Sequence, residues 1–428
     1  MASNNKSVRQ EWQQYKLSDV YDLTSKPSGI AIGKQSSIPF ISMSDIPQGG
    51  GLEYGFELKS PSDIASGTYF ERGDLLLSKI TPCFENGKQC VVNDLPNPFG
   101  MTSTEIYPIK AKKGISTAYY LFFLLLDPSV RASIEEKMEG STGRKRVPKD
   151  VIEGLKIHLP PVDEQEKISG ILLKIQHQIK YEESLVQSGT ELLRSAISSL
   201  VALNPESNSF PAEGNYKLTK LEDLCAIKNS SMSYGELLEA SKDQKTSSSI
   251  SVMGIKVSDM NFKGNEVYLK EASLERELSG PKILDRTIPP GSIVFPKRGA
   301  AIATNKKRIT TKHSVLDPNV IALVPNEKIN NKFLYYWFLN FDLKDITEPG
   351  PTPQLNKKNL APLLIPVPDL DMQMKATSIL ASIDDKVSIH RKKVDALREL
   401  FGSISKEMLS NKLCLDEISL EALGGTNG

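Results

Sequence analysis

The stretch YKLSDV, from Tyr15 to Val20, returns as YKLTKL, from Tyr216 to Leu221, and each copy opens a segment of similar plan. Four further stretches return in the same order. They are ISMSDI (41–46) with IKVSDM (255–260), GDLLLSK (73–79) with GSIVFPK (291–297), YYLFF (119–123) with LYYWF (334–338), and LKIHLP (155–160) with LLIPVP (363–368). A period of roughly 210 residues is too long for a solenoid and predicts a tandem duplication of one domain-plus-helix unit.

The first part of each copy is predicted to be a β-rich domain. Short β-type runs alternate with turn signals rich in Gly, Pro and Ser. These runs are 38–41, 74–80 and 105–109 in the first copy, and 293–295 and 320–324 in the second. The aromatic stretches at 119–123 and 334–338 are predicted to lie on helices that face the core.

The second part of each copy is predicted to be a long helix, from Glu164 to about Val201 and from about Met372 to Lys412. Apolar residues recur there at intervals of three and four, which is the spacing of a coiled-coil seam. The predicted seam residues are Ile168, Leu172, Ile175, Ile179 and Leu193 in the first helix, and Ile383, Val387, Val394, Leu397 and Phe401 in the second. Glu182 and Gly189 interrupt the first series.

A helix of about 40 residues is roughly 60 Å long. Asp163 and Asp371 follow prolines and are predicted as N-caps. An isolated helix with an exposed apolar stripe is unfavourable, so we expect the two helices to pack on each other as an antiparallel spacer. The predicted fold class is therefore α+β, with two β-rich domains in tandem, each followed by a long helix. The expected boundaries are 1–160 and 205–368 for the domains, 161–204 and 369–412 for the helices, and 413–428 for the tail.

Composition limits the function without assigning it. The chain has 428 residues and a formal net charge of +1, so only a local concentration of basic residues would indicate nucleic-acid binding. The four cysteines form no CxxC pair, which fits a reducing compartment. The first residues lack the apolar segment of a secretory signal, and no apolar run approaches the roughly 20 residues that span a bilayer. We expect a cytoplasmic protein without membrane contact.

Sequence motifs for catalysis are not found. The chain has no GxxxxGK[ST] loop, no GxSxG elbow and no methyltransferase tetrad such as Asn-Pro-Pro-Tyr. Its four histidines are dispersed without metal-ligand spacing. We therefore expect no catalytic residue, no metal and no cofactor on this chain.

Two stretches resemble type I restriction–modification specificity subunits. One is LLSKITPCFENGK (76–88), which is similar to a string common in their recognition domains, and the other is VPKD to PPVDEQ (147–165), which resembles their exit from domain to helix. The resemblance covers about 12–412, although the second copy departs from the first motif with FPKRGA (295–300). It implies a non-catalytic subunit that binds double-stranded DNA at a bipartite target.

The resemblance also implies partners. Two modification subunits would hold S-adenosylmethionine and methylate adenine, and two motor–nuclease restriction subunits can join for cleavage. The candidate DNA contacts are basic and polar side chains on loops that contain Gly and Pro. In the first domain these are Lys79, Asn86, Lys88, Ser141, Thr142, Arg144, Lys145, Arg146 and Lys149. In the second they are Lys297, Arg298, Thr304, Asn305, Lys306, Lys307, Arg308, Lys312, His313, Asn356, Lys357 and Lys358.

Each of these residues could instead be an ordinary solvated surface group. The near-neutral charge also leaves open a second class of protein, a coiled-coil scaffold with duplicated protein-binding domains and no DNA contact. Two positive concavities would favour recognition of DNA over that alternative.

Overall fold

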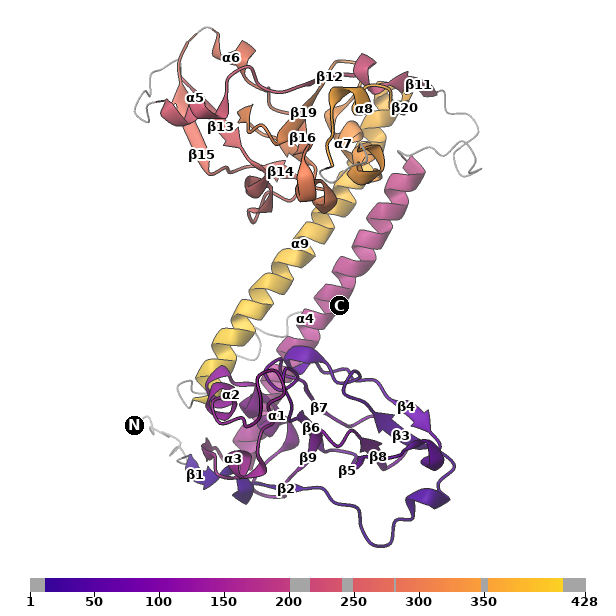
Figure 1. Ribbon diagram of the computed structural model, residues 1–428, viewed down its shortest axis with the longest axis vertical. Coiled ribbons are helices and arrows are strands. Elements are labelled where there is room, and N and C mark those ends of the chain that lie inside the picture. The colour runs from indigo at the N-terminus through magenta and orange to yellow at the C-terminus, as the bar shows by residue number, and fades with distance from the viewer. Residues whose placement is uncertain (1–11, 201–215, 241–248, 281, 348–352, 411–428) are drawn as a thin grey trace, which may run out of the picture. The chain divides into compact units, whose positions relative to one another are not determined.

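The computed structural model describes residues 12–200, 216–240, 249–280, 282–347 and 353–410. The chain divides into two compact units, 1–183 with 392–428 and 184–391 (Figure 1). The predicted tail, 413–428, lies outside the described residues.

Within its described residues, the first unit contains three small sheets and three short α-helices besides its parts of the long helices. Their strand orders are β2-β9-β6-β7, β4-β3-β8-β5 and β1-β10. The strands are β1 (Gln13–Lys16), β2 (Tyr21–Leu23), β3 (Ile38–Ile41), β4 (Glu57–Lys59), β5 (Thr68–Glu71), β6 (Leu75–Ser78), β7 (Gln89–Val91), β8 (Phe99–Thr102), β9 (Ile106–Ala111) and β10 (Lys156–Leu159). The helices are α1 (Ala118–Leu126), α2 (Pro128–Glu135) and α3 (Lys149–Glu153), and short 3-10 turns are η1 (Leu17–Asp19), η2 (Ile32–Lys34), η3 (Gln48–Gly50) and η4 (Pro61–Asp63).

The second unit follows the same plan with different sheet sizes. Its strand orders are β12-β19-β16-β17-β14, β15-β13-β18 and β11-β20. The strands are β11 (Tyr216–Lys220), β12 (Cys225–Lys228), β13 (Ile250–Ile255), β14 (Tyr268–Leu269), β15 (Leu274–Leu278), β16 (Ile293–Pro296), β17 (Arg308–Thr310), β18 (His313–Leu316), β19 (Val320–Pro325) and β20 (Leu364–Pro368). The short helices are α5 (Tyr234–Glu239), α6 (Ile283–Arg286), α7 (Asn331–Leu339) and α8 (Lys357–Leu360), with 3-10 turns η5 (Leu221–Asp223), η6 (Val257–Asn261), η7 (Gly299–Thr304) and η8 (Leu343–Ile346).

The mixed α/β character predicted from the sequence is confirmed, and the aromatic stretches form the centres of the two cores. Tyr120 and Phe122 of α1 are fully buried, as is Phe338 of α7. In each unit this helix packs in one apolar cluster with the neighbouring sheet. The same clusters include residues of the long helices, so each domain is joined to its helix by a continuous core.

The two long helices are α4 (Val162–Leu200) and α9 (Leu370–Leu409). Asp163 and Asp371 lie inside the first turns and are not the N-caps expected from the sequence. Asp369 caps α9 instead, since its Oδ1 accepts a hydrogen bond from the Met372 backbone at 2.8 Å. Asp163 and Asp371 still stabilise these first turns, because the N-terminal end of a helix is electropositive and favours negative charge.

Within each unit, segments of α4 and α9 contribute to one core. In the first unit, Ile168 and Leu172 of α4 share a cluster with Met408 of α9. In the second, Ile197 of α4 shares a cluster with Leu380 of α9. Every predicted seam residue is buried or half-buried.

Both interruptions of the predicted seam have a structural explanation. Gly189 faces Val387, and a β-carbon at position 189 would come within 2.6 Å of the valine side chain. Glu182 is only 4% exposed, accepts a hydrogen bond from Gln178 at 3.1 Å and pairs with Lys393 at 3.6 Å. A glycine therefore permits close approach of the two helices, and a paired carboxylate occupies an otherwise apolar position.

A buried glutamine fastens each long helix to its domain. Gln165 accepts a hydrogen bond from the Thr117 backbone at 3.0 Å and donates to the Ile115 and Pro160 carbonyls at 2.8 and 2.9 Å. Gln373 makes the corresponding three hydrogen bonds: it accepts one from the Asn330 backbone N–H and donates to the Lys328 and Pro368 carbonyls. Thr117 and Asn330 are the N-caps of α1 and α7, so each glutamine fixes a long helix against the aromatic helix.

In the part of the chain that the structure describes, no helix is both long enough and apolar enough to cross a membrane.

Replacing Gln165 by leucine should lower the free energy of unfolding of the first unit by about 2–4 kcal/mol, because buried backbone groups lose their partners. Each unit contains one of the two tryptophans, Trp12 or Trp337. A Trp337→Phe background therefore lets urea unfolding of the first unit be followed by Trp12 fluorescence. Gln48→Leu is the control, since Gln48 lies in the same unit and its side chain is exposed. Equal effects of the two substitutions would contradict the assigned role.

Candidate nucleic-acid interface

The end of strand β6 and the loop that leads into α3 form one junction in the first domain. The Val147 backbone N–H donates to the Lys79 carbonyl at 2.8 Å, and the Thr81 N–H donates to the Lys145 carbonyl at 3.0 Å. This pairing brings the two predicted groups, Lys79 and the run 140–146, side by side.

The second domain contains an equivalent junction at the end of β16. The Leu355 N–H donates to the Lys297 carbonyl at 2.9 Å, and the Gly299 N–H donates to the Pro353 carbonyl at 2.8 Å. Lys297 and Arg298 thus meet the segment that opens α8, on which Lys357 and Lys358 are exposed. The same backbone pairing therefore assembles a basic cluster in each domain.

Neighbouring groups restrain the side chains of the first cluster. The Lys79 ammonium lies 4.9 Å from the centre of the Tyr107 ring, a cation–π contact, and Tyr107 donates its hydroxyl hydrogen to the Val147 carbonyl at 3.0 Å. Burial raises the pKa of Tyr107, so the phenol remains a neutral donor. Arg146 pairs with Glu105 and Lys149 with Glu153, which neutralises part of the positive charge.

The tip of this loop carries the more available cations. Gly140 and Gly143 have positive φ values of 126° and 78°, which allow the tight reversal between Glu139 and Arg146. Ser141, Thr142, Arg144 and Lys145 are exposed. Among the described residues, Arg144 and Lys145 are in no ion pair. Their charges can therefore meet phosphate groups without first leaving a carboxylate.

Asn86 and Lys88 lie on the segment after β6, which is held from several sides. The Gly49 N–H donates to the Asn86 carbonyl at 2.8 Å, and the Lys88 ammonium donates to the Met43 carbonyl at 2.7 Å. Lys88 is half-buried and its ammonium is engaged, whereas the Asn86 side chain is exposed. Lys88 thus shapes the loop, and Asn86 is the better placed of the two to contact a base edge.

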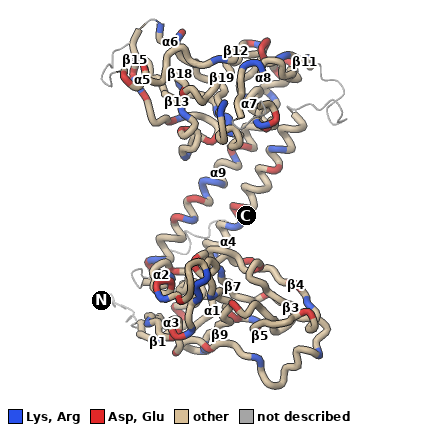
Figure 2. The backbone as a smooth tube through the Cα atoms, in the orientation of Figure 1, with Lys and Arg blue, Asp and Glu red and all other residues tan. Residues whose placement is uncertain are grey.

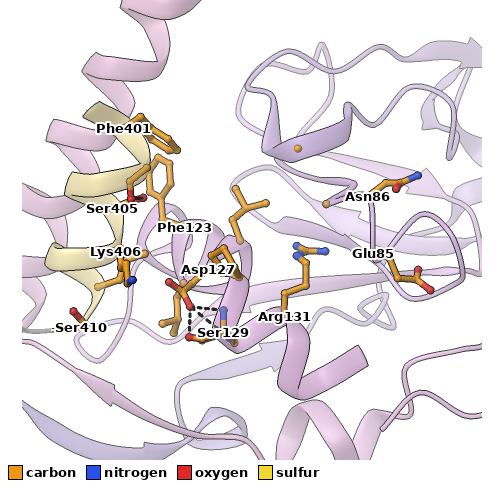
Figure 3. A pocket seen from close by; sticks show the side chains of 18 residues that line it. Glu85, Asn86, Phe123, Asp127, Ser129, Arg131, Phe401, Ser405, Lys406 and Ser410 are labelled. Atoms are coloured by element: carbon orange, nitrogen blue, oxygen red, sulfur yellow. Dashed lines mark hydrogen bonds between the residues drawn. The ribbon is translucent and has the colours of Figure 1, made fainter. Parts of the chain in front are cut away.

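A cavity of about 860 Å³ lies beside this segment (Figure 3). Glu85 and Asn86 line one side, Phe123 and Arg131 another, and Phe401 with neighbouring residues of the last turns of α9 a third. It therefore lies where the segment after β6, the helices α1 and α2 and the end of α9 come together in the first unit.

Lys307 and Arg308 were predicted to contact DNA, and the structure argues against both. Lys307 is 1% exposed, and its ammonium donates to Asn305 Oδ1 at 2.7 Å and to the Phe341 carbonyl at 2.5 Å. The half-buried Arg308 donates to the Lys307 and Met260 carbonyls. Burial lowers the pKa of both groups. The hydrogen bonds that they donate end on backbone carbonyls and on the Asn305 side chain, so these two residues support the domain from within.

Asn305 also has a structural role that its sequence position did not reveal. It ends η7 with a left-handed φ of 51°, and its side-chain oxygen accepts from both Lys307 and the Leu343 backbone. Thr304 donates its hydroxyl hydrogen to the Ala301 carbonyl, and Asn356 accepts from Gln354 at 3.2 Å. Lys306 donates to Asn261.

Lys312 and His313 lie away from the Lys297 junction. Because β16 and β17 are antiparallel, with Ile293 opposite Ile309, residues after Thr310 lie beyond the start of β16 and Lys297 lies at its end. Lys312 pairs with Glu275 at 2.5 Å, and the His313 ring shares a hydrogen bond with Thr287 at 2.9 Å. Burial lowers the pKa of His313, which favours the neutral ring. The DNA contacts predicted for the second domain therefore do not form one cluster: Lys312 and His313 lie apart from the residues around Lys297.

Sequence reasoning missed Arg131 and Gln354. Arg131 lies among apolar residues of α2 and gave no loop signal. Gln354 forms a backbone bridge with Arg298 that corresponds to the bridge of Arg146 with Ile80. Only this backbone pairing reveals that Gln354 is the equivalent of Arg146.

Within the described ranges, no group of three or more His, Cys, Asp or Glu side chains is placed to hold a metal ion.

Comparison with known proteins identifies the class. Residues 9–187 and 213–399 match the type I restriction modification DNA specificity domain, so the chain carries two such domains. The chain therefore belongs to the family of type I restriction–modification specificity subunits, the non-catalytic components that supply DNA sequence specificity.

Individual relatives are similar over parts of their length. The type I restriction enzyme EcoAI specificity subunit of Escherichia coli is 32% identical over 38% of this chain and 29% of its own length. The EcoEI specificity subunit of the same organism is 27% identical over 46% of this chain and 33% of its own. The chain thus matches about a third of these curated relatives. The crystal structure of a type I S subunit from M. genitalium shares the fold, with a TM-score of 0.60, 14% identity, and coverage of 95% of this chain and 98% of that one.

The buried ammonium of Lys307 should make the stability of the second unit depend on pH. Burial lowers its pKa from 10.5 to about 8, although the charge of Asp342 opposes the shift. Between these values the unfolded chain holds a proton that the folded unit has released, so the free energy of unfolding should rise with pH, by on the order of 2–3 kcal/mol. Urea unfolding of a Trp12→Phe background, followed by Trp337 fluorescence from pH 7.5 to pH 10.5, measures this rise.

Lys307→Met should remove that rise, whereas Lys357→Met, at an exposed position, should keep it. Parallel pH profiles for wild type and Lys307→Met would show that Lys307 does not titrate in this range.

Proposed function

We propose that this chain recognises a bipartite DNA target, one half-site with each domain, and directs adenine methylation by partner subunits. The observation that carries the proposal is the recurrence of the same backbone junction at Lys79 and at Lys297, each within a DNA specificity domain. Each domain would read one half-site with the segments at its junction. Because both domains belong to one chain, binding of the first raises the effective concentration of the second at its half-site.

Exposed side chains at these junctions suit both phosphate contacts and contacts with base edges. Arg144 and Lys145 would contact phosphates, which positions the domain without reading sequence. Exposed polar groups such as Asn86 and Thr142 would donate to or accept from base edges in the major groove. The second domain offers exposed Arg298 and Lys357 at its own junction, although neither occupies the position equivalent to Arg144 or Lys145.

The long helices α4 and α9 would act as an antiparallel coiled-coil spacer. Contacts within the second unit support this arrangement: Gly189 faces Val387, whereas Ile197, further along α4, shares a cluster with Leu380, which lies nearer the start of α9. A rod of fixed length would set the number of unspecified base pairs between half-sites, as dimer geometry does in other DNA-binding proteins.

Partner subunits would supply the chemistry. Two modification subunits would hold S-adenosylmethionine, and restriction subunits would join them for cleavage. Exposed apolar side chains on α9 support a docking role for the helices: Met374 and Ile389 are 59% and 52% exposed and line a shallow surface groove with Ala381. Acidic and basic residues both occur along α4 and α9 (Figure 2), so a partner would meet mixed charge around these apolar positions.

Methylome sequencing of cells that contain the modification subunits, with and without this gene, tests the proposal. We expect adenine methylation at one two-part motif only when the gene is present. Methylation that is unchanged by the gene, or a complex that binds no duplex, would instead favour the scaffold alternative.

Substitution of Arg144 and Lys145 by alanine should weaken DNA binding and reduce its salt dependence. Each lost phosphate contact lowers the slope of log K against log salt concentration by about 0.9. Titration of a labelled duplex at several salt concentrations measures this slope. The single variant Lys145→Ala is compared with a control, Lys113→Ala. The control also removes one exposed charge, but at a position beyond the end of β9 that lies far from the junction. The slope of that control should stay at the wild-type value, and an unaltered slope for the double variant would exclude the loop from the interface.

Insertion of one heptad into both helices should lengthen the unspecified gap. Seven residues add about 10 Å to each helix, which corresponds to roughly three base pairs of duplex. The motif found by methylome sequencing gives the gap directly. An unchanged gap in a folded, active variant would show that the helices do not measure the spacing.

A further inference from the structure

A buried cation lies beneath the same segment in each domain. Arg131 of the first domain is 7% exposed and Lys307 of the second is 1% exposed. Among the described residues, neither forms a salt bridge with a carboxylate. The charges of Glu135 and Glu85 act on Arg131, and that of Asp342 acts on Lys307, but only from beyond salt-bridge distance. Burial therefore still carries a desolvation penalty, which an apolar side chain of similar size would avoid.

Arg131 connects the segment after β6 with the end of α1. Its guanidinium donates to the Phe84 carbonyl, to the Leu125 carbonyl at 2.8 Å and to Gln89 Oε1 at 2.9 Å. It also lies 4.6 Å from the centre of the Phe84 ring. Figure 3 shows Arg131 on the helix between Asp127 and the segment that carries Glu85 and Asn86.

Lys307 makes the corresponding connection in the second domain with a different side chain. Its ammonium donates to Asn305, which ends the turn after β16, and to the Phe341 carbonyl just beyond α7. Leu125 belongs to the last turn of α1, and Phe341 follows the last residue of α7 by two positions, so each acceptor lies near the C-terminal end of the aromatic helix of its domain. That end carries partial negative charge, so a cation is favoured there.

We propose that Arg131 and Lys307 are positioning residues, each of which holds the segment after β6 or β16 in the conformation that reads its half-site. The inference rests on the proposed function. Each segment is fixed on one side by the junction with the basic loop, at Thr81 or Gly299. The buried cation fixes the other side, so the two contacts together determine where the exposed side chains between them point.

A readout of half-site discrimination separates positioning from a purely structural role. The complex with its modification subunits is incubated with duplexes whose central segment is randomised, and bound duplexes are sequenced. Arg131→Met should reduce the preference for the cognate base about tenfold in one half-site and leave the other unchanged, since a base contact contributes about that factor. Lys307→Met should do the same in the opposite half-site.

Variants that keep the charge or remove one acceptor extend the test. Arg131→Lys and Lys307→Arg should restore part of the lost preference. Asn305→Gly removes the side-chain acceptor while tolerating the left-handed backbone, and Gln89→Met removes the acceptor beside Arg131. These two should affect the same half-sites as Lys307→Met and Arg131→Met, even if a methionine variant at the cation fails to fold.

Lys137→Met is the control, because it removes an exposed cation just after α2 and should leave both half-sites intact. Weaker binding with both base preferences unchanged, or loss of preference in the same half-site for both variants, would overturn the inference. A wild-type complex that selects no two-part motif would instead contradict the proposed function, so the two failures are distinguishable.

Discussion

The buried glutamine at the start of each long helix is the constraint on which the organisation of each unit depends. Apolar contacts between a helix and a domain are non-directional, so they do not by themselves select one orientation. Gln165 and Gln373 add direction, since each makes three hydrogen bonds to backbone groups in two different segments. A rotation of the helix about its axis would leave those buried groups without partners. The exit angle of the helix is thereby tied to the N-cap of the aromatic helix.

The two domains keep this framework while their recognition segments differ. The junction at Lys79 and that at Lys297 use the same backbone hydrogen bonds, which place no demand on the side chains. Beneath the segments, arginine in one domain and lysine in the other donate to carbonyls at the end of the aromatic helix. Backbone acceptors allow such an exchange because any donor of suitable reach satisfies them. Surface side chains can therefore vary between the domains without disturbing the support.

Long periodic segments and the internal repeat could be predicted from the sequence because they involve many residues at once. The helices, the aromatic cores and the runs at 38–41 and 293–295 are examples. The burial and contacts of single side chains were harder to predict. Lys307 and Lys306 are adjacent in sequence, yet one is fully buried and the other half-buried, since the bond to the Phe341 carbonyl depends on a segment 34 residues away. Asp369 rather than Asp371 caps α9 because a cap depends on local backbone geometry, which residue type alone does not specify. Lys312 separates from Lys297 because the register of β16 and β17 is a tertiary property.

The small net charge is consistent with the distribution of ion pairs. Arg146, Lys149 and Lys312 pair with carboxylates in their domains, and Lys393 and Arg398 pair with Glu182 and Glu183 on α4. These pairs engage part of the positive charge within the fold, whereas Arg144 and Lys145 at the first junction are in no ion pair among the described residues and can attract a duplex. Non-specific affinity grows with the number of phosphates neutralised, but those contacts carry no sequence information. If the chain reads a bipartite target, its discrimination must then come chiefly from base contacts in two half-sites. On that proposal, well-fixed recognition segments would offset the unfavourable burial, beneath each of them, of a cation that forms no salt bridge among the described residues.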